Sequence, residues 1–203
     1  MRDKSCLSYV RRHISNLVDG QIFTTRDCLK YGTRQNVDNA LYKCVKDGLI
    51  IRIVPGVFTR RSSNFEFPSY LEIARIKACA FGKKLLDHGA DLAAKLRLPT
   101  IANQDPVFYV NGSSSKFQYR GVTIFLTKAS NKRMRLRDDN VGQALRALWH
   151  AGKDVVTNRL IDKAVTFITF RANKEKVILN KAWLPSWLAD HFQVNHYIGP
   201  YKT

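Results

Sequence analysis

The stretch that decides the fold is residues 22–60, IFTTRDCLKYGTRQNVDNALYKCVKDGLIIRIVPGVFTR. Within it, Thr33–Asp47 begins with a capping threonine, carries a helical apolar period and is followed directly by a glycine, so it predicts a helix. The run Leu49–Val54 is rich in β-branched residues, Pro55-Gly56 is a turn pair, and Val57–Thr59 predicts a return strand. The stretch therefore predicts a helix followed by a hairpin.

Two further helices are predicted ahead of this pair. Apolar residues recur at spacings of three and four along Lys4–Leu17, which indicates an amphipathic first helix. Ile22-Phe23 predicts a small strand, and Thr24 or Thr25 is expected to cap a short second helix that ends at Tyr31-Gly32. Three helices followed by a hairpin is the order of a winged helix-turn-helix, which we assign to residues 1–63.

The third helix has two different faces. At 100° per residue its inward positions are apolar, namely Val37, Ala40, Leu41, Cys44 and Val45. The opposite face carries long polar and amide side chains, which are the types that read base edges and hold phosphates: Gln35, Asn36, Asn39, Tyr42, Lys43 and Lys46.

These residues predict a duplex-DNA interface. We expect Gln35 and Asn39 to approach bases, and Arg34, Lys43 and the arginines of the hairpin to bind phosphates. The negative charge of Asp38 would repel phosphates, so we expect this carboxylate to pair with a Lys or Arg. The alternative is a solvated face of a core helix. The full predicted contact set is Thr24, Thr25, Arg26, Thr33, Arg34, Gln35, Asn36, Asn39, Tyr42, Lys43, Lys46, Arg52, Arg60 and Arg61.

The composition favours an anionic partner. The 203 residues include 34 Lys and Arg against 16 Asp and Glu, a formal net charge of +18, which is typical of proteins that bind nucleic acid. No apolar run is long enough to span a bilayer, and no secretion signal is evident, so we expect a cytoplasmic protein without a membrane partner. The four cysteines form no CxxC pair and have no His at metal-ligand spacing, which indicates reduced thiols.

Residues 64–203 predict an α+β second domain. A helix should follow Ser69 as its cap, with Leu71, Ile73, Ile76, Ala80 and Phe81 facing inward. Further helices are predicted near 89–96, 141–149, 157–170 and 184–192, and strands over 106–110 and 117–127 predict a small antiparallel sheet.

The densest basic run lies in this second domain, between Lys128 and Arg137. One interpretation is a solvated loop or a strand edge guarded by charge. The other is a second surface for nucleic acid or a partner, made by Lys128, Lys132, Arg133, Arg135 and Arg137.

Catalytic chemistry is not indicated. His88 lies between Asp87 and Asp91, but no Ser or Cys nucleophile accompanies it, and Asp91 suits a helix start. Asp138-Asp139 also precede a helix. No P-loop, Rossmann glycine pattern or zinc motif occurs. We therefore expect no catalytic residue, cofactor or metal.

The segment Phe23–Arg60 resembles the winged-helix domain of the AbiEi family of bacterial antitoxins and transcriptional regulators. The Gly32 turn and the Asn36–Leu41 stretch carry the match. So do the Asp47–Ile50 junction and the wing Pro55–Phe58. The compact subgroup of that family is similar over most of the rest, at His88–Asp91, Ala93-Ala94, Leu96, Leu98-Pro99, Val110–Gly112, Asn131–Met134, Gln143–Leu145, His150–Gly152 and Leu184–Trp187.

The resemblance implies a repressor that binds operator repeats in double-stranded DNA. It also implies that the second domain neutralises a nucleotidyltransferase-like toxin, directly or indirectly, and the protein would meet DNA as a monomer or a dimer. Two alternatives stay open. One is a nucleic-acid-processing enzyme or accessory with a winged-helix targeting domain. The other is a plain transcription factor whose second domain binds a ligand or dimerises.

Overall fold

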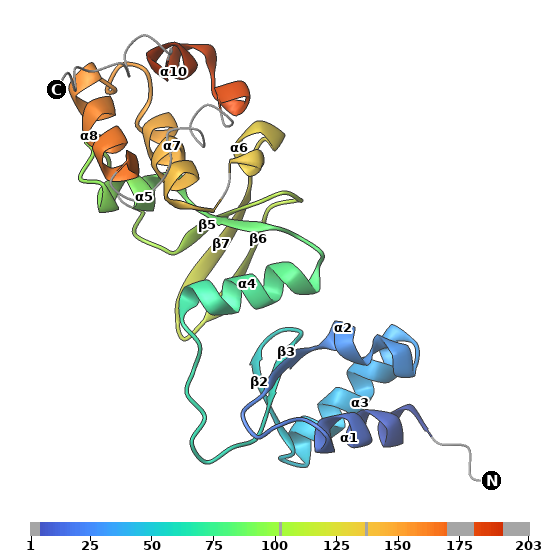
Figure 1. Ribbon diagram of the computed structural model, residues 1–203. Coiled ribbons are helices and arrows are strands. Elements are labelled where there is room, and N and C mark those ends of the chain that lie inside the picture. The colour runs from blue at the N-terminus through green and yellow to red at the C-terminus, as the bar shows by residue number, and fades with distance from the viewer. Residues whose placement is uncertain (1–4, 102, 137, 170–180, 193–203) are drawn as a thin grey trace, which may run out of the picture. The chain divides into compact units, whose positions relative to one another are not determined.

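The computed structural model describes residues 5–101, 103–136, 138–169 and 181–192 (Figure 1). The fold is α+β, as predicted. The chain forms two compact units, residues 1–83 with 116–124 and residues 84–115 with 125–203. Each unit has its own packed interior, so we describe them in turn.

The first unit contains the predicted winged helix. Its three-stranded sheet has the order β1-β3-β2, and both pairs are antiparallel, with Phe23 opposite Phe58 and Arg52 also opposite Phe58. The third helix precedes the β2–β3 hairpin, which is the wing (Figure 1). In chain order the elements are α1 (Cys6–Ser15), β1 (Ile22–Thr24), α2 (Thr25–Cys28), the 3₁₀ turn η1 (Leu29–Tyr31), α3 (Arg34–Lys46), β2 (Ile50–Val54) and β3 (Val57–Arg60).

Side-chain caps set the starts of these helices. The Thr33 hydroxyl accepts from the Asn36 N–H, and the Ser5 hydroxyl accepts from the Ser8 N–H. At α2 the cap is Thr24, whose N–H and hydroxyl both donate to Asp27 Oδ2, at 2.7 and 2.8 Å. Capping satisfies backbone donors that a helix start otherwise leaves open. The predicted caps at Thr33 and Thr24 are confirmed.

The predicted apolar faces of the helices form the core of the winged helix. Helices α1 and α3 pack together, and a single core joins them to the sheet. Its buried members are Val10, Ile14, Leu17, Phe23, Cys28, Val37, Ala40, Leu41, Cys44, Ile50 and Phe58. Because α3 fills the core with one face, its opposite face is left to solvent.

Helix α4 (Tyr70–Ala80) falls within this first unit, which extends past residue 63, where the sequence predicts the domain boundary. The Arg26 guanidinium donates to the Ala80 carbonyl at 3.0 Å, and Lys77 Nζ donates to the Pro55 carbonyl at 2.7 Å. These bonds hold the end of α4 against α2 and the wing turn. The polar segment around Ser62–Asn64, next to that predicted boundary, lies within residues 1–83.

The inward face of α4 also differs from the prediction. Ser69 caps the helix as expected, and Ile73 is buried together with Ala74 and Ala78. Phe81 was predicted to face inward, but 65% of its surface is exposed. It lies just past the end of the helix, where the helical period no longer directs the side chain.

The remaining strands form a four-stranded sheet of order β4-β5-β7-β6. Strand β5 pairs antiparallel with β4 but parallel with β7, so the prediction of an antiparallel sheet is wrong at this pair. Strand β7, the second strand of the β6–β7 hairpin, lies beside β5 in place of β6. The neighbour of β5 therefore runs parallel to it and not antiparallel. The strands are β4 (Leu85–Asp87), β5 (Val107–Val110), β6 (Ser115–Tyr119) and β7 (Val122–Lys128).

The helices of the second unit pack around α7 (Figure 1). A Cβ on Gly89 would lie 2.5 Å from His150 Cβ, so α5 and α7 approach each other as closely as only glycine permits. The buried Leu145 and Leu148 centre the core. The elements are α5 (Gly89–Lys95), α6 (Asn131–Arg135), α7 (Asn140–Ala151), α8 (Asn158–Thr169), η2 (Lys181–Trp183), α10 (Ser186–Ala189) and η3 (Asp190–Phe192).

None of the helices in the described part of the chain is long and apolar enough to cross a membrane.

Candidate nucleic-acid interface

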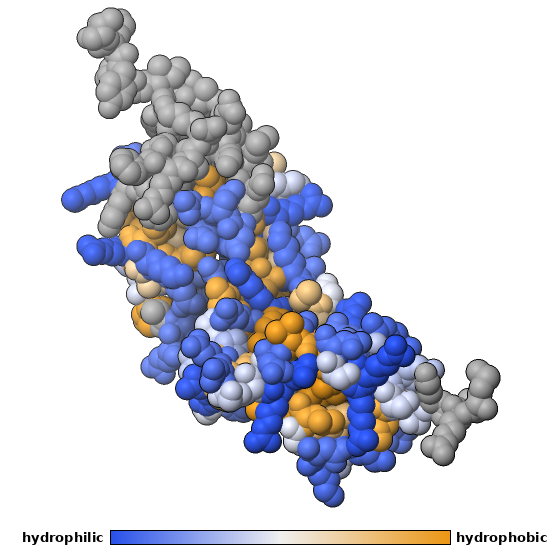
Figure 2. Space-filling model, turned by 60° about the horizontal axis from the view of Figure 1, so that its bottom comes forward, coloured by the Kyte–Doolittle hydropathy of each residue, from blue (hydrophilic) through white to orange (hydrophobic). Residues whose placement is uncertain are grey.

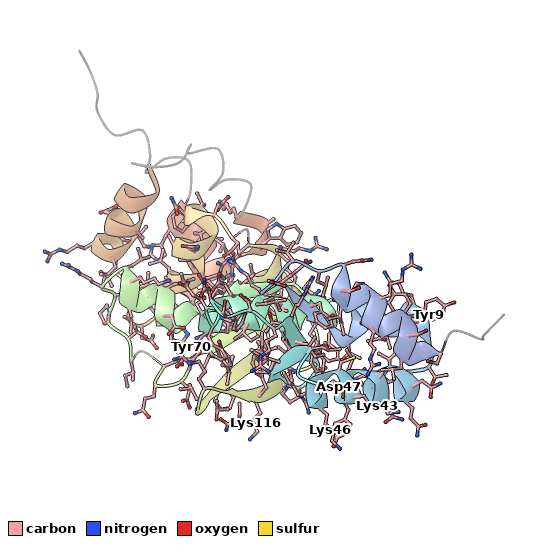
Figure 3. The ribbon with its side chains drawn as sticks, turned by 90° about the horizontal axis from the view of Figure 1, so that it is seen from below. Tyr9, Lys43, Lys46, Asp47, Tyr70 and Lys116 are labelled. Atoms are coloured by element: carbon pink, nitrogen blue, oxygen red, sulfur yellow. The ribbon has the colours of Figure 1, made fainter. Side chains whose placement is uncertain are left out.

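The outer face of α3 is a continuous polar surface. Gln35, Asn39 and Lys43 are exposed, and 68% of the Tyr42 surface is open to solvent. Within the described residues, no hydrogen bond or ion pair engages the side chains of Gln35, Asn39, Lys43 or Lys46. Figure 3 labels Lys43 and Lys46 on the outer side of this helix. These amides and ammonium groups are available to another molecule.

Arg34 and Asp38 form an ion pair along one edge of this face. Arg34 Nε lies 2.7 Å from Asp38 Oδ2, one helical turn away, which confirms the prediction that Asp38 pairs with a basic residue. Both side chains are about half exposed, and an exposed pair at this spacing contributes only about 0.3–0.5 kcal/mol. Arg34 can therefore leave Asp38 for a phosphate at small cost.

The wing presents Arg52 beside α3. Arg52 is exposed on β2, and the hairpin turns at Pro55-Gly56, where Gly56 has a φ of +81° that a side chain would strain. The Thr25 N–H donates to the Gly56 carbonyl at 3.0 Å, which fixes the turn against α2. Arg52 therefore lies on a hairpin whose turn is fixed to α2. Arg61, which follows β3, is exposed as well.

Arg60 was predicted to bind phosphate, but its guanidinium is used inside the fold. It pairs with Asp19 Oδ1 at 2.9 Å, donates to the Ser15 carbonyl at 2.9 Å and also donates to the Leu17 carbonyl. These bonds satisfy carbonyls at the end of α1 and fasten β3 to it. We therefore remove Arg60 from the predicted contact set.

Three other predicted contacts at α2 are also engaged or buried. Thr24 and Thr25 are 8% and 4% exposed, and the Thr24 hydroxyl is bound to Asp27. Arg26 is exposed but donates to the Ala80 carbonyl. Of these three predicted contacts, only Arg26 reaches the surface, and its guanidinium already has a partner. The sequence cannot distinguish a capping threonine from a phosphate-binding one.

A groove of about 490 Å³ runs along the same edge of α3 that carries Arg34 and Asp38. The helix contributes one wall, the wing a second, and the end of α4 a third. Lys77 and Phe81 on α4 belong to this wall, and sequence reasoning did not assign either of them to a site. The lining residues are Thr25, Arg34, Asp38, Tyr42, Val45, Arg52, Pro55, Gly56, Phe58, Lys77 and Phe81.

Two arginines of the basic run between Lys128 and Arg137 contact aromatic rings of the same unit. The Arg133 guanidinium lies over the rings of Tyr109 and Trp149, at 5.2 and 4.6 Å from their centroids. Arg135 lies 4.2 Å from the ring centroid of Trp183. Cation–π contacts of this kind hold the helix and the aromatic residues together. Lys128 and Lys132 are exposed, while Arg137 lies outside the described residues.

His88 serves as the cap of α5. Its Nδ1 accepts from the Ala90 N–H at 3.3 Å, and its ring lies against Tyr109 and His150. Burial, together with smaller contributions from the nearby His150 and Arg133, lowers the pKa of His88 to about 4. The imidazole is therefore neutral near pH 7. This arrangement supports the structural interpretation of His88 over the catalytic one.

Two cysteines are core residues. Burial, together with the nearby Asp27, raises the pKa of the Cys28 thiol to about 12. Burial also raises the pKa of the Cys44 thiol. Neither thiol is a nucleophile near neutral pH. In the described part of the chain, no three or more His, Cys, Asp or Glu side chains form a group suited to a metal ion.

A comparison with protein-family models places the chain in a family without an assigned function. The matching model, described as "Family of unknown function (DUF6088)", covers residues 9–177 and so includes both units. A search of curated proteins found no match. Because the family model spans most of the sequence, the chain belongs to the DUF6088 family.

Proposed function

We propose that the chain is a DNA-binding regulator that inserts α3 into the major groove of duplex DNA. One observation supports this most: α3 keeps Gln35, Asn39, Lys43 and Lys46 exposed and without partners in the described residues, next to a basic wing. An α-helix fits the major groove, and amide side chains are the usual readers of adenine. Surface amides without an intramolecular use are the side chains that such an interface requires.

Charge supports the same proposal. The formal net charge of +18 is far more than solubility needs, and it favours binding to a polyanion. Arg34, Lys43, Lys46 and Arg52 flank the amides on α3 and the wing, and Arg61 follows β3. In this account the basic residues supply affinity for any duplex, and Gln35 and Asn39 supply sequence preference.

The antitoxin role remains a hypothesis that rests on the sequence resemblance alone. It would make the DNA an operator of the protein's own operon and would give the second unit a toxin to neutralise, directly or indirectly. A DNA-binding regulator of this kind works in the cytoplasm. Co-expression of this chain with the product of an adjacent nucleotidyltransferase-like gene tests the idea, because an antitoxin restores growth and an unrelated regulator does not.

The DNA-binding proposal is tested by gel shift with duplex from upstream of the gene that encodes this chain. The test variant carries Gln35→Ala and Asn39→Ala together. Each well-formed bidentate contact to a base contributes about 1–3 kcal/mol of discrimination, so we expect the preference for the upstream duplex over a scrambled one to fall by about tenfold or more. Affinity for the scrambled duplex should change little.

A matched control removes two exposed amides elsewhere, Asn64→Ala with Gln104→Ala. This control should retain the preference. Unchanged sequence preference in the Gln35 and Asn39 variant would contradict the assignment of these residues to base reading.

A further inference from the structure

We propose that the groove between α3, the wing and α4 binds a nucleotide, with its phosphate on Arg52 and Lys77 and its base against Phe81. This inference goes beyond the proposed duplex binding, since the groove takes one nucleotide and needs no paired strand. Its two decisive residues, Lys77 and Phe81, lie outside the predicted DNA-contact set.

The size of the groove fits a small ligand. Its volume of about 490 Å³ lies within the range of about 300–1,000 Å³ that small-molecule sites occupy. Its walls come from three anchored elements. The wing turn is held by the bond from the Thr25 N–H to the Gly56 carbonyl, and α4 is held by the bond from Lys77 to the Pro55 carbonyl. A site built on anchored elements is formed before a ligand arrives.

The charge at the base of the groove favours an anion. The Lys77 ammonium is half-buried beside the rings of Phe81 and Phe117, at 5.9 and 5.2 Å from their centroids. Burial lowers the pKa of Lys77, and the nearby positive charge of Arg52 lowers it as well. Asp38, the carboxylate that lines the groove, is already paired with Arg34. A phosphate between Arg52 and Lys77 would relieve the repulsion of these two cations.

The aromatic lining favours a base as the second part of the ligand. Phe81 is 65% exposed and Tyr42 is 68% exposed, and both line the groove. Figure 2 shows one face of the molecule on which apolar surface stays open among hydrophilic side chains. Exposed aromatic rings next to cations are the usual platform for stacking an unpaired base. Phosphate-binding cations and open rings in one groove match the two parts of a nucleotide.

The test measures binding of adenosine 5′-monophosphate to the full chain by calorimetry and by amide chemical shifts. Adenosine and inorganic phosphate are titrated separately. We expect the monophosphate to bind at least about tenfold more tightly than either part, because a charge-assisted hydrogen bond and a stacked base each contribute that much. The largest amide shifts should fall at Tyr42, Arg52 and Phe81.

Two variants sharpen the assignment. Lys77→Met keeps the aliphatic stem and removes the charge, and Phe81→Leu keeps an apolar side chain and removes the ring. Each should weaken binding of the monophosphate by about tenfold. The matched controls are Arg12→Met and Phe67→Leu, which alter an exposed cation and a 52% exposed ring outside the groove, and they should leave binding unchanged. Thermal melting of each variant separates lost binding from lost folding.

A second experiment distinguishes a nucleotide at the end of a DNA strand from a free nucleotide. A blunt duplex is compared with the same duplex carrying one unpaired 5′-phosphorylated adenosine. Tighter binding of the duplex with the unpaired nucleotide, lost in Lys77→Met, would identify a strand end as the source, whereas binding of the free monophosphate alone would identify a soluble nucleotide. The proposal is overturned if neither probe binds, if inorganic phosphate binds as well as the monophosphate, or if the shifts lie outside the groove.

Binding of the monophosphate does not use the two residues assigned to base reading. The variant with Gln35→Ala and Asn39→Ala should still bind the monophosphate with wild-type affinity.

Discussion

Two helices that both carry several basic residues, α3 in the first unit and α6 in the second, differ in how these residues are used. On α3 the side chains of Lys43 and Lys46 extend into solvent without a partner among the described residues. On α6 the guanidinium groups of Arg133 and Arg135 lie on aromatic rings. The comparison teaches that a count of charges does not locate an anion site. What matters is whether each charged group still has a donor open to another molecule.

The largest effect should come from Arg146, a cation in the core of the second unit. It is fully buried on α7 and donates to Asp138 Oδ1 at 2.9 Å and to the Leu136 carbonyl at 3.3 Å. Asp138→Ala leaves this guanidinium in the core without its carboxylate, and we expect a loss of about 3 kcal/mol in the free energy of unfolding. Urea unfolding measures it. A loss below about 0.5 kcal/mol would mean that the buried charge does not depend on Asp138.

A second test compares neighbouring arginines of the first unit. Arg60→Ala removes an ion pair and two bonds to carbonyls at the end of α1, so we expect it to lower the free energy of unfolding by about 2 kcal/mol. Arg61→Ala, at an exposed position, should change stability by less than about 0.5 kcal/mol. Thermal melting distinguishes them. Equal stability of the two variants would return Arg60 to the candidates for phosphate binding.

A third test concerns α6 itself. Arg133→Ala and Arg135→Ala should each lower the free energy of unfolding by about 1 kcal/mol, because each loses contacts with aromatic rings. Neither change should alter the salt dependence of DNA binding. The matched variant is Lys132→Ala on the same helix, which is exposed and should leave stability unchanged. If the arginine variants melt like wild type and bind DNA more weakly, α6 is a second nucleic-acid surface after all.

The smallest effect expected is a pH dependence from His88. Its pKa is about 4 in the folded protein and near 6.5 when unfolded, so the unfolded state takes up the proton first as the pH falls. Stability is therefore complete above pH 6.5 and is lost between about 6.5 and 4. We expect His88→Gln to reduce this loss by about 1 kcal/mol, a value that allows for the half-exposed ring. Melting at pH 7 and pH 4.5 measures it, and an equal loss in both proteins would assign the effect to other groups.

Local signals in the sequence predicted the winged helix well. The caps Thr24 and Thr33, the apolar faces of α1 and α3 and the turn at Pro55-Gly56 all depend on residues close together in the chain. Such features can be derived from period and turn chemistry alone. The exposed face of α3 followed from the same period.

Several of the failures depend on contacts between residues far apart in the sequence. The partner of Arg60 is Asp19, that of Arg26 is the Ala80 carbonyl, and Arg135 lies on Trp183. The parallel pairing of β5 with β7 and the groove wall at Lys77 arise in the same way. A basic residue in a sequence shows its charge but not its partner, so sequence reasoning overestimates the surface available to phosphates.

The most direct test of the central claim is the salt dependence of duplex affinity. If Arg34, Lys43, Lys46, Arg52 and Arg61 neutralise phosphates, the logarithm of the binding constant should fall with the logarithm of salt concentration at a slope of about −4.5. Replacing Lys43, Lys46 and Arg52 with Ala together should bring this slope to between about −1 and −2, while Arg133→Ala with Arg135→Ala leaves it at the wild-type value. Absence of duplex binding at low salt, or a slope that the triple variant leaves unchanged, would contradict the account.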